Sequence, residues 1–473
     1  MEGPAYTGYQ IAKGSTHNSL GVIHYAAVMK SCGKHTPVSV KPIPSPTAAA
    51  GRRALGAILA GRSVIPALSV FHEELGDVFQ LSLGSFNPVF MVGPDAARFM
   101  LVTARNKLLW RTEHDPVTTL LRNGFLVTDG DAHEFLRSAI SPSLHRSRLE
   151  EYLPVMWRST DRIALDWSTA GGAVDMLVEM RRVALLIVMD TLFNVDILPD
   201  LDRILPAILD VLRYISPGLW TVWPRAPRRG FERSLRMIDD YLYALIEKRR
   251  AGIDVGDDLL SRLIDVPEMD DDSIRDQMLT LLIAGHDTST ALLAWLLVVL
   301  GQNPSVYDDV QSEIATVLGN DAPSLESISC LRYMRQVVDE TLRLYPPIHI
   351  GNRLAVEELD YDGYRIAAGT RVVYSIYLTH RHPQFWQDPQ RFDPDRFAAH
   401  RRSEIAPYSF LPFGGGPRNC IGAAFAQIEA RVVLARILQR FELEPAGAAI
   451  RPYMGATLEP HPGVPMYIRS RRR

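Results

Sequence analysis

The stretch Phe413-Gly-Gly-Gly-Pro-Arg-Asn-Cys-Ile-Gly422 carries the most information in this chain. Its three consecutive glycines let the backbone pass close to another group and adopt positive φ angles. Cys420 ends this loop and precedes a helix predicted at residues 423–440. The unsatisfied N–H groups and positive dipole end of a helix N-terminus lower the pKa of a thiol and favour its thiolate. Cys420 is therefore predicted to act chemically, although the usual role of a free cysteine is that of a small buried side chain.

The overall composition is that of an ordinary globular protein, and it excludes several classes of protein. The chain has 473 residues, of which 47% are hydrophobic and 22% charged, so a disordered or fibrous chain is excluded. Lys and Arg number 51 against 54 Asp and Glu, a net charge of −3, which does not indicate a nucleic-acid-binding protein. An odd, sparse set of three cysteines indicates a reducing compartment. Cys32 and Cys330 lie in no motif, which leaves Cys420.

Two other roles for the Cys420 loop are not favoured by its surroundings. No second Cys or His stands nearby at the spacing of zinc ligands, and no Gly-Lys-Ser/Thr follows, as a phosphate-binding loop requires. The loop resembles the haem-binding loop F-x-x-G-x-R-x-C-x-G of the cytochrome P450 family, whose fixed positions are filled here by Phe413, Gly416, Arg418, Cys420 and Gly422. The resemblance implies that Cys420 is the thiolate ligand of a haem iron, with Phe413, Arg418 and Gly422 around the cofactor.

A second motif, Ala284-Gly-His-Asp-Thr-Ser289, lies inside a predicted helix. Glycine, an acid and hydroxyl residues are poor choices for a helix interior. Ala284 and Thr288 share a helix face, so the Thr288 hydroxyl is predicted to bond to the Ala284 carbonyl and open the helix there. A kinked core helix with satisfied polar groups is the alternative. The resemblance to the family's oxygen-binding groove A-G-x-D-T implies that Thr288 steadies dioxygen and that Asp287 supplies protons.

The apolar run from Met278 to Leu300, which contains this motif, is long enough to cross a membrane. A charge at bilayer depth costs at least about 2.5 kcal/mol, and the motif places Asp287 at the middle of the run. A buried helix with a polar functional centre is therefore predicted. No secretory signal is visible at the N-terminus, and a cytoplasmic protein with no membrane span is expected.

Glu340-Thr-Leu-Arg343 puts an acid and a base three residues apart on one helix face. Such a pair is weak evidence alone, because exposed pairs are common and contribute little to stability. Phe392-Asp-Pro-Asp-Arg-Phe397 resembles the later loop of the family, whose arginine joins this pair. The resemblance implies a buried triad of Glu340, Arg343 and Arg396, with a role in structure and haem loading.

His133 and Arg137 stand four residues apart and would point the same way on a helix. Two cations on one face suit a pair of carboxylates, although a solvated helix face is the alternative. The family places such a helix over the haem propionates, and Arg353 and Arg418 match two further propionate contacts. His382 stands where the family's His-Arg-Asp-Pro stretch has an acid, a departure that we expect to have no consequence.

The hydrophobic pattern predicts a helix-rich chain with small sheets. The expected segments are a hairpin at 77–93, helices over 94–345, strands over 352–376, an ordered loop over 383–419 and an amphipathic helix at 423–440. No compositional shift marks a linker, so we expect a mainly α protein with small β-sheets (α+β), in which residues 41–473 form one domain. Residues 1–40 show no periodicity and are expected to be a poorly ordered extension. The resemblance implies the cytochrome P450 fold, enclosing haem.

The implied function is that of a haem-thiolate monooxygenase, which inserts one oxygen atom of O2 into an apolar substrate. The resemblance implies haem b and electrons derived from NAD(P)H. No flavin or iron–sulfur segment is visible, so a separate ferredoxin, ferredoxin reductase or flavodoxin-type donor is expected. Four arginines near the thiolate-side elements are candidates to dock it, or are scattered surface charges: Arg146, Arg148, Arg431 and Arg436.

Candidate pocket walls follow from family position, although any of them could be plain core. They are Trp110 to Leu126, Leu281, Ala284, Ile348, Ile350 and Met454. Two other functions remain open. One is a haem-thiolate enzyme that uses peroxide, or that isomerises or dehydrates its substrate. The other is a non-catalytic haem sensor or carrier. The pair of Asp287 and Thr288 argues against both, and a monomer is expected.

Overall fold

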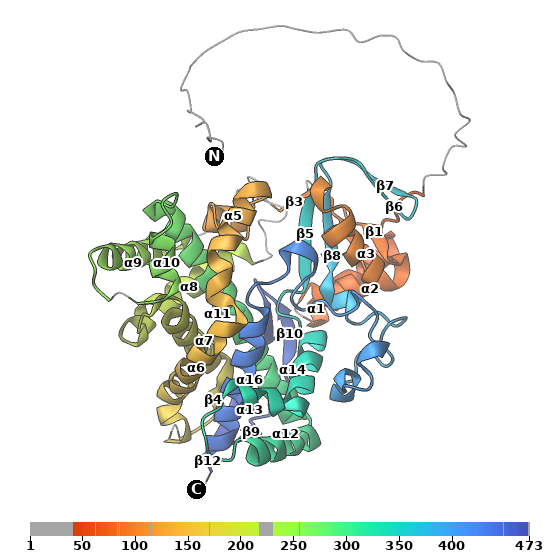
Figure 1. Cartoon of the computed structure of the whole chain (residues 1–473). Coiled ribbons are helices and arrows are strands. Elements are labelled where there is room, and N and C mark those ends of the chain that lie inside the picture. Colours follow the sequence, from red (N-terminus) through yellow and green to blue (C-terminus); the bar gives the residue numbers. More distant parts are fainter. Residues whose placement is uncertain are drawn as a thin grey trace, which may run out of the picture. The chain divides into compact units, whose positions relative to one another are not determined.

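The computed structural model describes residues 41–61, 63–82, 84, 86–110, 112, 115–169, 171–216, 230–254, 256–447 and 449–471. The extension predicted for residues 1–40 lies outside these residues. Helices dominate the described part and its strands are short (Figure 1). The predicted mainly α fold with small β-sheets is therefore confirmed.

The α-helices lie mostly between residues 48 and 344, with α15 and α16 later in the chain. They are α1 (Ala48–Gly61), α2 (Ile65–Leu75), α3 (Pro94–Arg98), α4 (Pro116–Leu121), α5 (Gly130–Ile140), α6 (Leu149–Ile163), α7 (Met176–Phe193), α8 (Leu201–Ile215), α9 (Phe231–Arg250), α10 (Leu259–Ile264), α11 (Asp271–Gln302), α12 (Pro304–Val317), α13 (Leu325–Cys330), α14 (Arg332–Leu344), α15 (Ile376–Thr379) and α16 (Ala423–Arg440).

The strands form small sheets that bring distant segments together. They are β1 (Val78–Gln80), β2 (Val89–Met91), β3 (Leu108–Leu109), β4 (Val174–Asp175), β5 (Ile350–Ala355), β6 (Leu359–Tyr361), β7 (Tyr364–Ile366), β8 (Arg371–Ser375), β9 (Phe441–Pro445), β10 (Arg451–Met454), β11 (Leu458–His461) and β12 (Pro465–Ser470). The largest sheet has the order β1-β2-β8-β5-β3, and only its β2–β8 pair is parallel. The hairpin predicted at 77–93 is confirmed, with Phe79 opposite Phe90.

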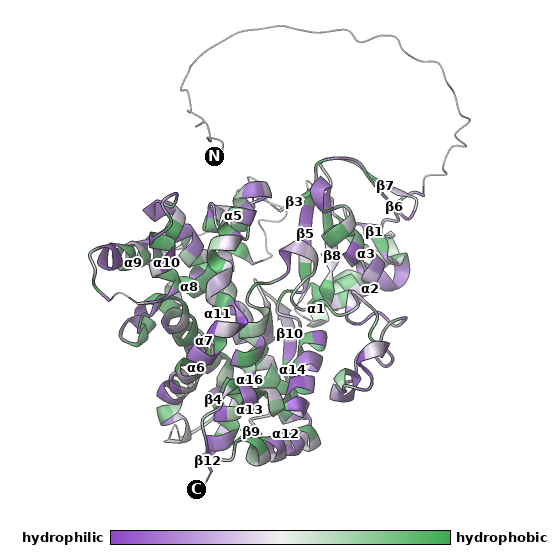
Figure 2. Ribbon diagram, viewed as in Figure 1, coloured by the Kyte–Doolittle hydropathy of each residue, from purple (hydrophilic) through white to green (hydrophobic). Residues whose placement is uncertain are grey.

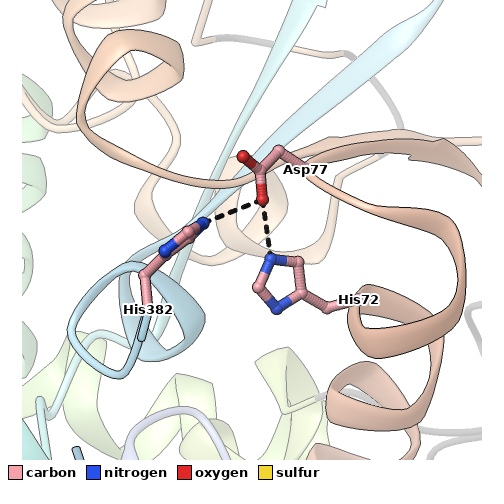
Figure 3. Close-up of side chains that lie close together, drawn as sticks. All are labelled: His72, Asp77 and His382. Atoms are coloured by element: carbon pink, nitrogen blue, oxygen red, sulfur yellow. Dashed lines mark hydrogen bonds and ion pairs between the residues drawn. The ribbon is translucent and has the colours of Figure 1, made fainter. Parts of the chain in front are cut away.

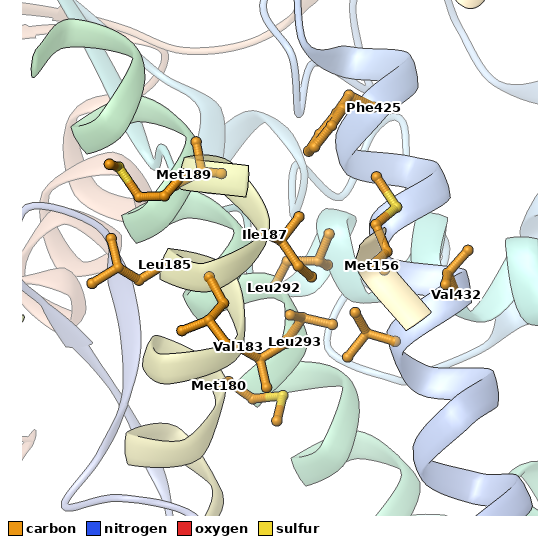
Figure 4. Packing of buried hydrophobic residues seen from close by; sticks show 14 of the residues in the cluster. Met156, Met180, Val183, Leu185, Ile187, Met189, Leu292, Leu293, Phe425 and Val432 are labelled. Atoms are coloured by element: carbon orange, nitrogen blue, oxygen red, sulfur yellow. The ribbon is translucent and has the colours of Figure 1, made fainter. Parts of the chain in front are cut away.

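The main core surrounds α11, which packs against α7, α9, α14 and α16. Figure 4 shows aliphatic and methionine side chains of α7 and α11, with Met156 and Val432 beside them. In Figure 2 the hydrophobic colour concentrates on interior helices, and the hydrophilic colour marks outer ones such as α9. Because apolar side chains leave water on burial, this packing fixes the position of α11.

Helix α11 is long and apolar enough to cross a membrane. Of its apolar segment, 83% is buried inside the protein. This burial agrees with the predicted core helix. The helix remains α-helical from Asp271 to Gln302, across the Ala284–Ser289 motif. The opening of the helix that was predicted at Thr288 is therefore wrong, because the backbone stays helical while the Thr288 hydroxyl bonds within it.

Helix α16 occupies the predicted residues 423–440, but the amphipathic pattern predicted for it is wrong. Eight consecutive residues, Ile428–Ala435, are buried, which is more than two helical turns. Glu429 and Arg431 are among them. The charged residues suggested an outer face, whereas the neighbouring helices cover this segment on every side.

Candidate active site

The loop that leads to Cys420 depends on glycine at two positions. Gly414 and Gly416 have φ angles of 69° and 66°, in the left-handed region that side chains disfavour. A Cβ on Gly416 would lie 2.5 Å from the carbonyl oxygen of Leu101. The Cys420 N–H donates to the Phe413 carbonyl at 2.9 Å. The prediction of close backbone approach and positive φ is confirmed, and both fix where Cys420 emerges.

The thiol of Cys420 has accessible surface, although protein atoms surround it. Burial raises its pKa above the ordinary value, whereas the Gly422 N–H and the charge of Arg137 act to lower it. The lowered pKa expected from the helix N-terminus is therefore wrong for the protein groups alone, because desolvation outweighs these donors. A bound metal ion deprotonates a coordinating thiol outright. An accessible thiol in such surroundings fits a metal ligand.

Gly422 lies beside the Cys420 thiol, and Phe413 contacts Cys420 through the backbone. A Cβ on Gly422 would lie 3.8 Å from Sγ of Cys420, so the glycine leaves the approach to the sulfur open. Phe413 is partly buried and packs against the main core. Arg137 approaches the same loop from α5, where its two terminal nitrogens donate to the main-chain and side-chain oxygens of Asn419, each at 2.9 Å. Arg137 thus holds the loop that carries Cys420.

The predicted carboxylate-binding residues form a cluster with more positive than negative charge. Burial lowers the pKa of Arg418 to about 10, and the nearby charges of Arg353 and Arg137 lower it further. Burial, with Arg418 and Arg137, also lowers the pKa of His133 to about 4. Asp129 opposes both shifts and lies 2.9 Å from Arg418. Because mutual repulsion and burial disfavour these cations, carboxylates of a ligand would stabilise them. The cluster therefore fits the two propionates of haem.

Arg353 belongs to this cluster and is held by the indole of Trp110. Its guanidinium lies 4.2 Å from the Trp110 ring centroid, a cation–π contact, and donates to the Asn352 carbonyl at 2.7 Å. Its side chain comes from β5 and is buried, and burial lowers its pKa. The four predicted residues thus divide into Arg353, Arg418 and His133 in the cluster, and Arg137 on the loop.

One face of α11 is accessible in the middle of a buried run. Ala284, Gly285 and Thr288 are partly exposed, while the residues before and after them are buried. The Thr288 hydroxyl donates to the Ala284 carbonyl at 2.7 Å, as predicted. The small residues and the hydroxyl therefore line open space on a helix that is otherwise covered.

Asp287, the acid of the same motif, is buried beside Thr288. Burial raises its pKa to about 7, and the negative charge of Glu459 raises it further, while Thr457 and Arg181 oppose the rise. Arg181 comes from α7 and Glu459 from β11, and they pair at 2.8 Å. Neither residue was predicted from the sequence, because no motif or spacing links them to Asp287. The acid can therefore gain and lose a proton near neutral pH.

The predicted triad of Glu340, Arg343 and Arg396 is assembled. Two nitrogens of Arg343 each lie 2.7 Å from an oxygen of Glu340, and both side chains are fully buried. Arg396 approaches Glu340 at 3.5 Å and donates to the Asp388 carbonyl at 3.1 Å. Arg343 also donates to main-chain carbonyls of the loop after α15, at His380, Pro389 and Arg391. The triad therefore fastens α14 to the loop that precedes the Cys420 segment.

Comparison of the sequence with known proteins identifies the family of this chain. The family profile described as Cytochrome P450 matches residues 57–463. The chain belongs to the cytochrome P450 family. It is 32% identical to cyclooctatin synthase of Streptomyces melanosporofaciens, over 80% of this chain and 85% of that relative. It is also 32% identical to putative cytochrome P450 139 of Mycobacterium bovis, over 85% of this chain and 97% of that relative.

Another relative carries the name cyclooctat-9-en-7-ol 5-monooxygenase, from Streptomyces melanosporofaciens. It is 32% identical over 78% of this chain and 83% of the relative. Family and relatives together make the protein a cytochrome P450 monooxygenase, an oxidoreductase that uses haem iron with a cysteine thiolate ligand.

The predicted pocket residues of this cytochrome P450 differ in exposure. Ile348 is 42% exposed, which is unusual for a large apolar side chain next to a core strand. Ile350 is half-buried, whereas Leu281 and Met454 are buried. Within the predicted stretch from Trp110 to Leu126, residues 111, 113 and 114 lie outside the described residues. The predicted pocket residues therefore range from buried to exposed, and their pocket role stays a prediction.

The arginines predicted to dock an electron donor are mostly engaged within the protein. Arg431 is buried and donates to the Ile328 carbonyl at 2.9 Å. Arg436 pairs with Asp161 at 2.7 Å, and Arg148 pairs with Asp257 at 2.7 Å. The docking prediction is therefore wrong for the buried Arg431. Arg148 and Arg436 have internal partners that the charge pattern of the sequence does not reveal, and docking at these two arginines stays a prediction. Arg146 is exposed, as that prediction required.

Proposed function

We propose that Cys420 holds the iron of haem b, and that Arg353, Arg418 and His133 receive its two carboxylates. The proposal rests on one observation: the chain presents both an exposed Cys420 and a cluster of cations. The single negative charge of Asp129 does not neutralise that cluster. Arg137 would fix the Cys420 loop through Asn419 and add its positive charge near the thiolate. Phe413 and Gly422 would border the cofactor.

When bound, haem supplies the activation of O2 and the transfer of one oxygen atom to the substrate. The chain supplies proton transfer and orientation. Asp287 holds a proton on its carboxyl group near neutral pH, because burial raises its pKa to about 7. The Thr288 hydroxyl, fixed by its bond to the Ala284 carbonyl, has its oxygen free to accept a further hydrogen bond. The two side chains would deliver protons on the accessible face of α11.

The substrate is proposed to be a small apolar, cyclic molecule. The walls inferred from family position are apolar side chains: Leu281, Ala284, Ile348, Ile350 and Met454. Exposure of Ile348 supports a place in that wall. A relative named for oxygenation of cyclooctat-9-en-7-ol is consistent with an alicyclic substrate. Such a site binds by burial of apolar surface and gives little directional selection beyond shape.

Electrons are proposed to come from NAD(P)H through a separate ferredoxin or flavodoxin-type donor in the cytoplasm. An acidic donor would be attracted to exposed cations. These include Arg146 and, around the buried Asp339, Arg335 and Arg402, whose side chains are 48% and 49% exposed. Reversing the charge of Arg146 to Glu should slow haem reduction without changing substrate affinity. Arg213, exposed on α8, provides the matched reversal, and equal effects of the two would reject docking at Arg146.

The test of the central proposal is the absorption spectrum of the reduced, CO-bound protein. A strongly red-shifted band is expected for thiolate ligation, and Cys420→His should abolish it. Cys330→Ser, at an exposed cysteine of α13, should leave the band in place. A haem-loaded, folded protein without the band would refute the assignment of Cys420.

Turnover measurements distinguish this function from two alternatives, a peroxygenase and a non-catalytic haem sensor or carrier. The buried acid beside Thr288 favours O2-dependent chemistry, since proton delivery is what this pair provides. Turnover with peroxide alone, and none with NAD(P)H and a redox partner, would support a peroxygenase. Absence of oxidation for every compound that shifts the haem spectrum would support a sensor or carrier.

A further inference from the structure

Three side chains of types that can bind a metal lie close together, and none of them belongs to the Cys420 motif. His72 lies in the last turn of α2, Asp77 directly precedes β1, and His382 follows α15 (Figure 3). Their ligand atoms all lie within 4.8 Å of one another. The cluster joins segments more than 300 residues apart, and the cytochrome P450 function described above does not use it.

The geometry converges on a single carboxylate oxygen. Nε2 of His72 lies 2.8 Å from Oδ1 of Asp77, and Nε2 of His382 lies 3.0 Å from the same atom. The two rings meet edge to face, with centroids 5.3 Å apart. One carboxylate oxygen therefore contacts both imidazole rings.

We propose that His72, Asp77 and His382 form a binding site for one zinc ion. In a tetrahedral zinc site with bonds of about 2.0–2.2 Å, ligand atoms lie about 3.3 Å apart. The observed separations of 2.8 and 3.0 Å are within a few tenths of an ångström of this value. Two imidazole nitrogens disfavour Mg²⁺ and Ca²⁺, which take oxygen ligands, and suit zinc or a similar transition metal.

Access and the fourth ligand follow from the exposure of each side chain. His382 is buried, His72 is 14% exposed and Asp77 is 48% exposed. The carboxylate side is therefore open to solvent, so an ion can enter there and a water can complete the tetrahedron. The resemblance described above implies an acid at the position of His382, and this departure, which we expected to be without consequence, would provide a nitrogen ligand.

Three existing contacts must change when zinc binds. The Nε2 atoms of His72 and His382 would exchange their hydrogen bonds with Oδ1 of Asp77 for bonds to the metal. The Gln384 N–H donates to Nδ1 of His382 at 3.3 Å, at the long end of the hydrogen-bond range. A metal ligated through Nε2 leaves the proton on Nδ1, so this contact would be lost. Because these hydrogen bonds are given up, zinc binding is expected with moderate affinity. Binding to the folded state alone would also raise the melting temperature.

The test uses the full-length, haem-loaded protein after chelator treatment and dialysis against ZnCl2. Zinc per haem is measured by elemental analysis, and affinity by isothermal titration. One zinc per haem is expected, together with a higher melting temperature. His72→Gln, Asp77→Asn and His382→Gln should each weaken binding by roughly 100-fold or more, since each removes one of three ligands.

Asp77→Asn separates a metal site from a hydrogen-bonded cluster. Its amide oxygen can still accept from both histidines, so the fold is retained while the anionic ligand is lost. His400→Gln, at an exposed histidine elsewhere, is the matched control and should bind zinc as the wild type does. The CO-bound spectrum of each variant verifies intact haem. Absence of bound zinc, equal binding by Asp77→Asn, or an unchanged melting temperature would each overturn the proposal.

Discussion

Glu429 on α16 is a buried acid whose only side-chain partner among the described residues is a hydroxyl. Ser289 of α11 donates to its Oε2, and no positive charge acts on the carboxyl in that part of the chain. Burial raises its pKa from the ordinary 4.5 to about 8, and the Ser289 bond opposes the rise. The side chain is 2% exposed. Glu429 is therefore protonated in the folded protein at neutral pH.

The consequence is a defined loss of stability as pH rises. Below pH 4.5 the carboxyl is protonated in both the folded and unfolded states, so it has no effect on their balance. Between pH 4.5 and 8 only the folded state binds the proton, and the free energy of unfolding falls by ~1.4 kcal/mol per pH unit. Over the whole interval the loss reaches about 5 kcal/mol as an upper bound. Above pH 8 the buried site carries an uncompensated charge.

Glu429→Gln keeps the oxygen that accepts from Ser289 and removes the titration. Urea unfolding of the haem-loaded protein is measured at several values from pH 5 to 9. The variant and wild type should be similarly stable at pH 5, and the variant increasingly the more stable as pH rises. The difference between the two isolates Glu429, since Asp287 and Asp339 titrate equally in both.

Glu442→Gln provides the control for this measurement, because Glu442 is exposed at the start of β9, next to α16. Its stability should follow that of the wild type at every pH. A Glu429→Gln curve parallel to wild type between pH 5 and 9 would refute the buried, protonated carboxyl.

Three further outcomes follow from contacts at the site. Glu340→Gln leaves Arg343 buried without its counter-charge and should lower the free energy of unfolding by about 3–5 kcal/mol. The measurements are urea unfolding and the fraction of protein that retains haem. A loss under 1 kcal/mol would contradict the buried pair. Gly416→Ala sets a Cβ 2.5 Å from the Leu101 carbonyl oxygen at a positive φ and should weaken haem retention, whereas an unchanged haem content would show that the loop can move. In wild type the rate of turnover should fall as pH rises through about 7, where Asp287 loses its proton. Asp287→Asn should turn over more slowly, and its rate should not fall with pH in this range. A fall that persists in the variant would belong to another group.

The sequence predicted the parts of the site whose members are close together in the chain. The Cys420 loop, the bond from Thr288 to Ala284, and the pair of Glu340 with Arg343 each arise from backbone geometry over ten residues or fewer. Local geometry of this kind is determined by helix periodicity and by the conformational freedom of glycine. The hairpin at 77–93 was predictable for the same reason, since eight residues separate its two strands in the chain.

Features that depend on burial and on distant partners could not be predicted in this way. Arg431 was expected on the surface because it is charged, yet α16 is enclosed by its neighbours. The thiol of Cys420 was expected to have a lowered pKa, but the protein around it desolvates it more than the helix end stabilises it. The pairing of Arg181 with Glu459 spans 278 residues. In each case the deciding quantity is the environment after folding, which no local spacing encodes.

Three buried carboxyls differ in the charges that lie near them, although the sequence presents them as equivalent acids. Burial raises the pKa in all three, because an ionised group loses its hydration. Glu340 has the two nitrogens of Arg343 to compensate it, and this fits a structural anchor. Asp287 feels both Glu459 and Arg181, and its pKa near 7 fits an acid that exchanges protons. Glu429 has only a hydroxyl, so it stays neutral and packs. The role of each acid therefore depends on which cations the fold brings to it.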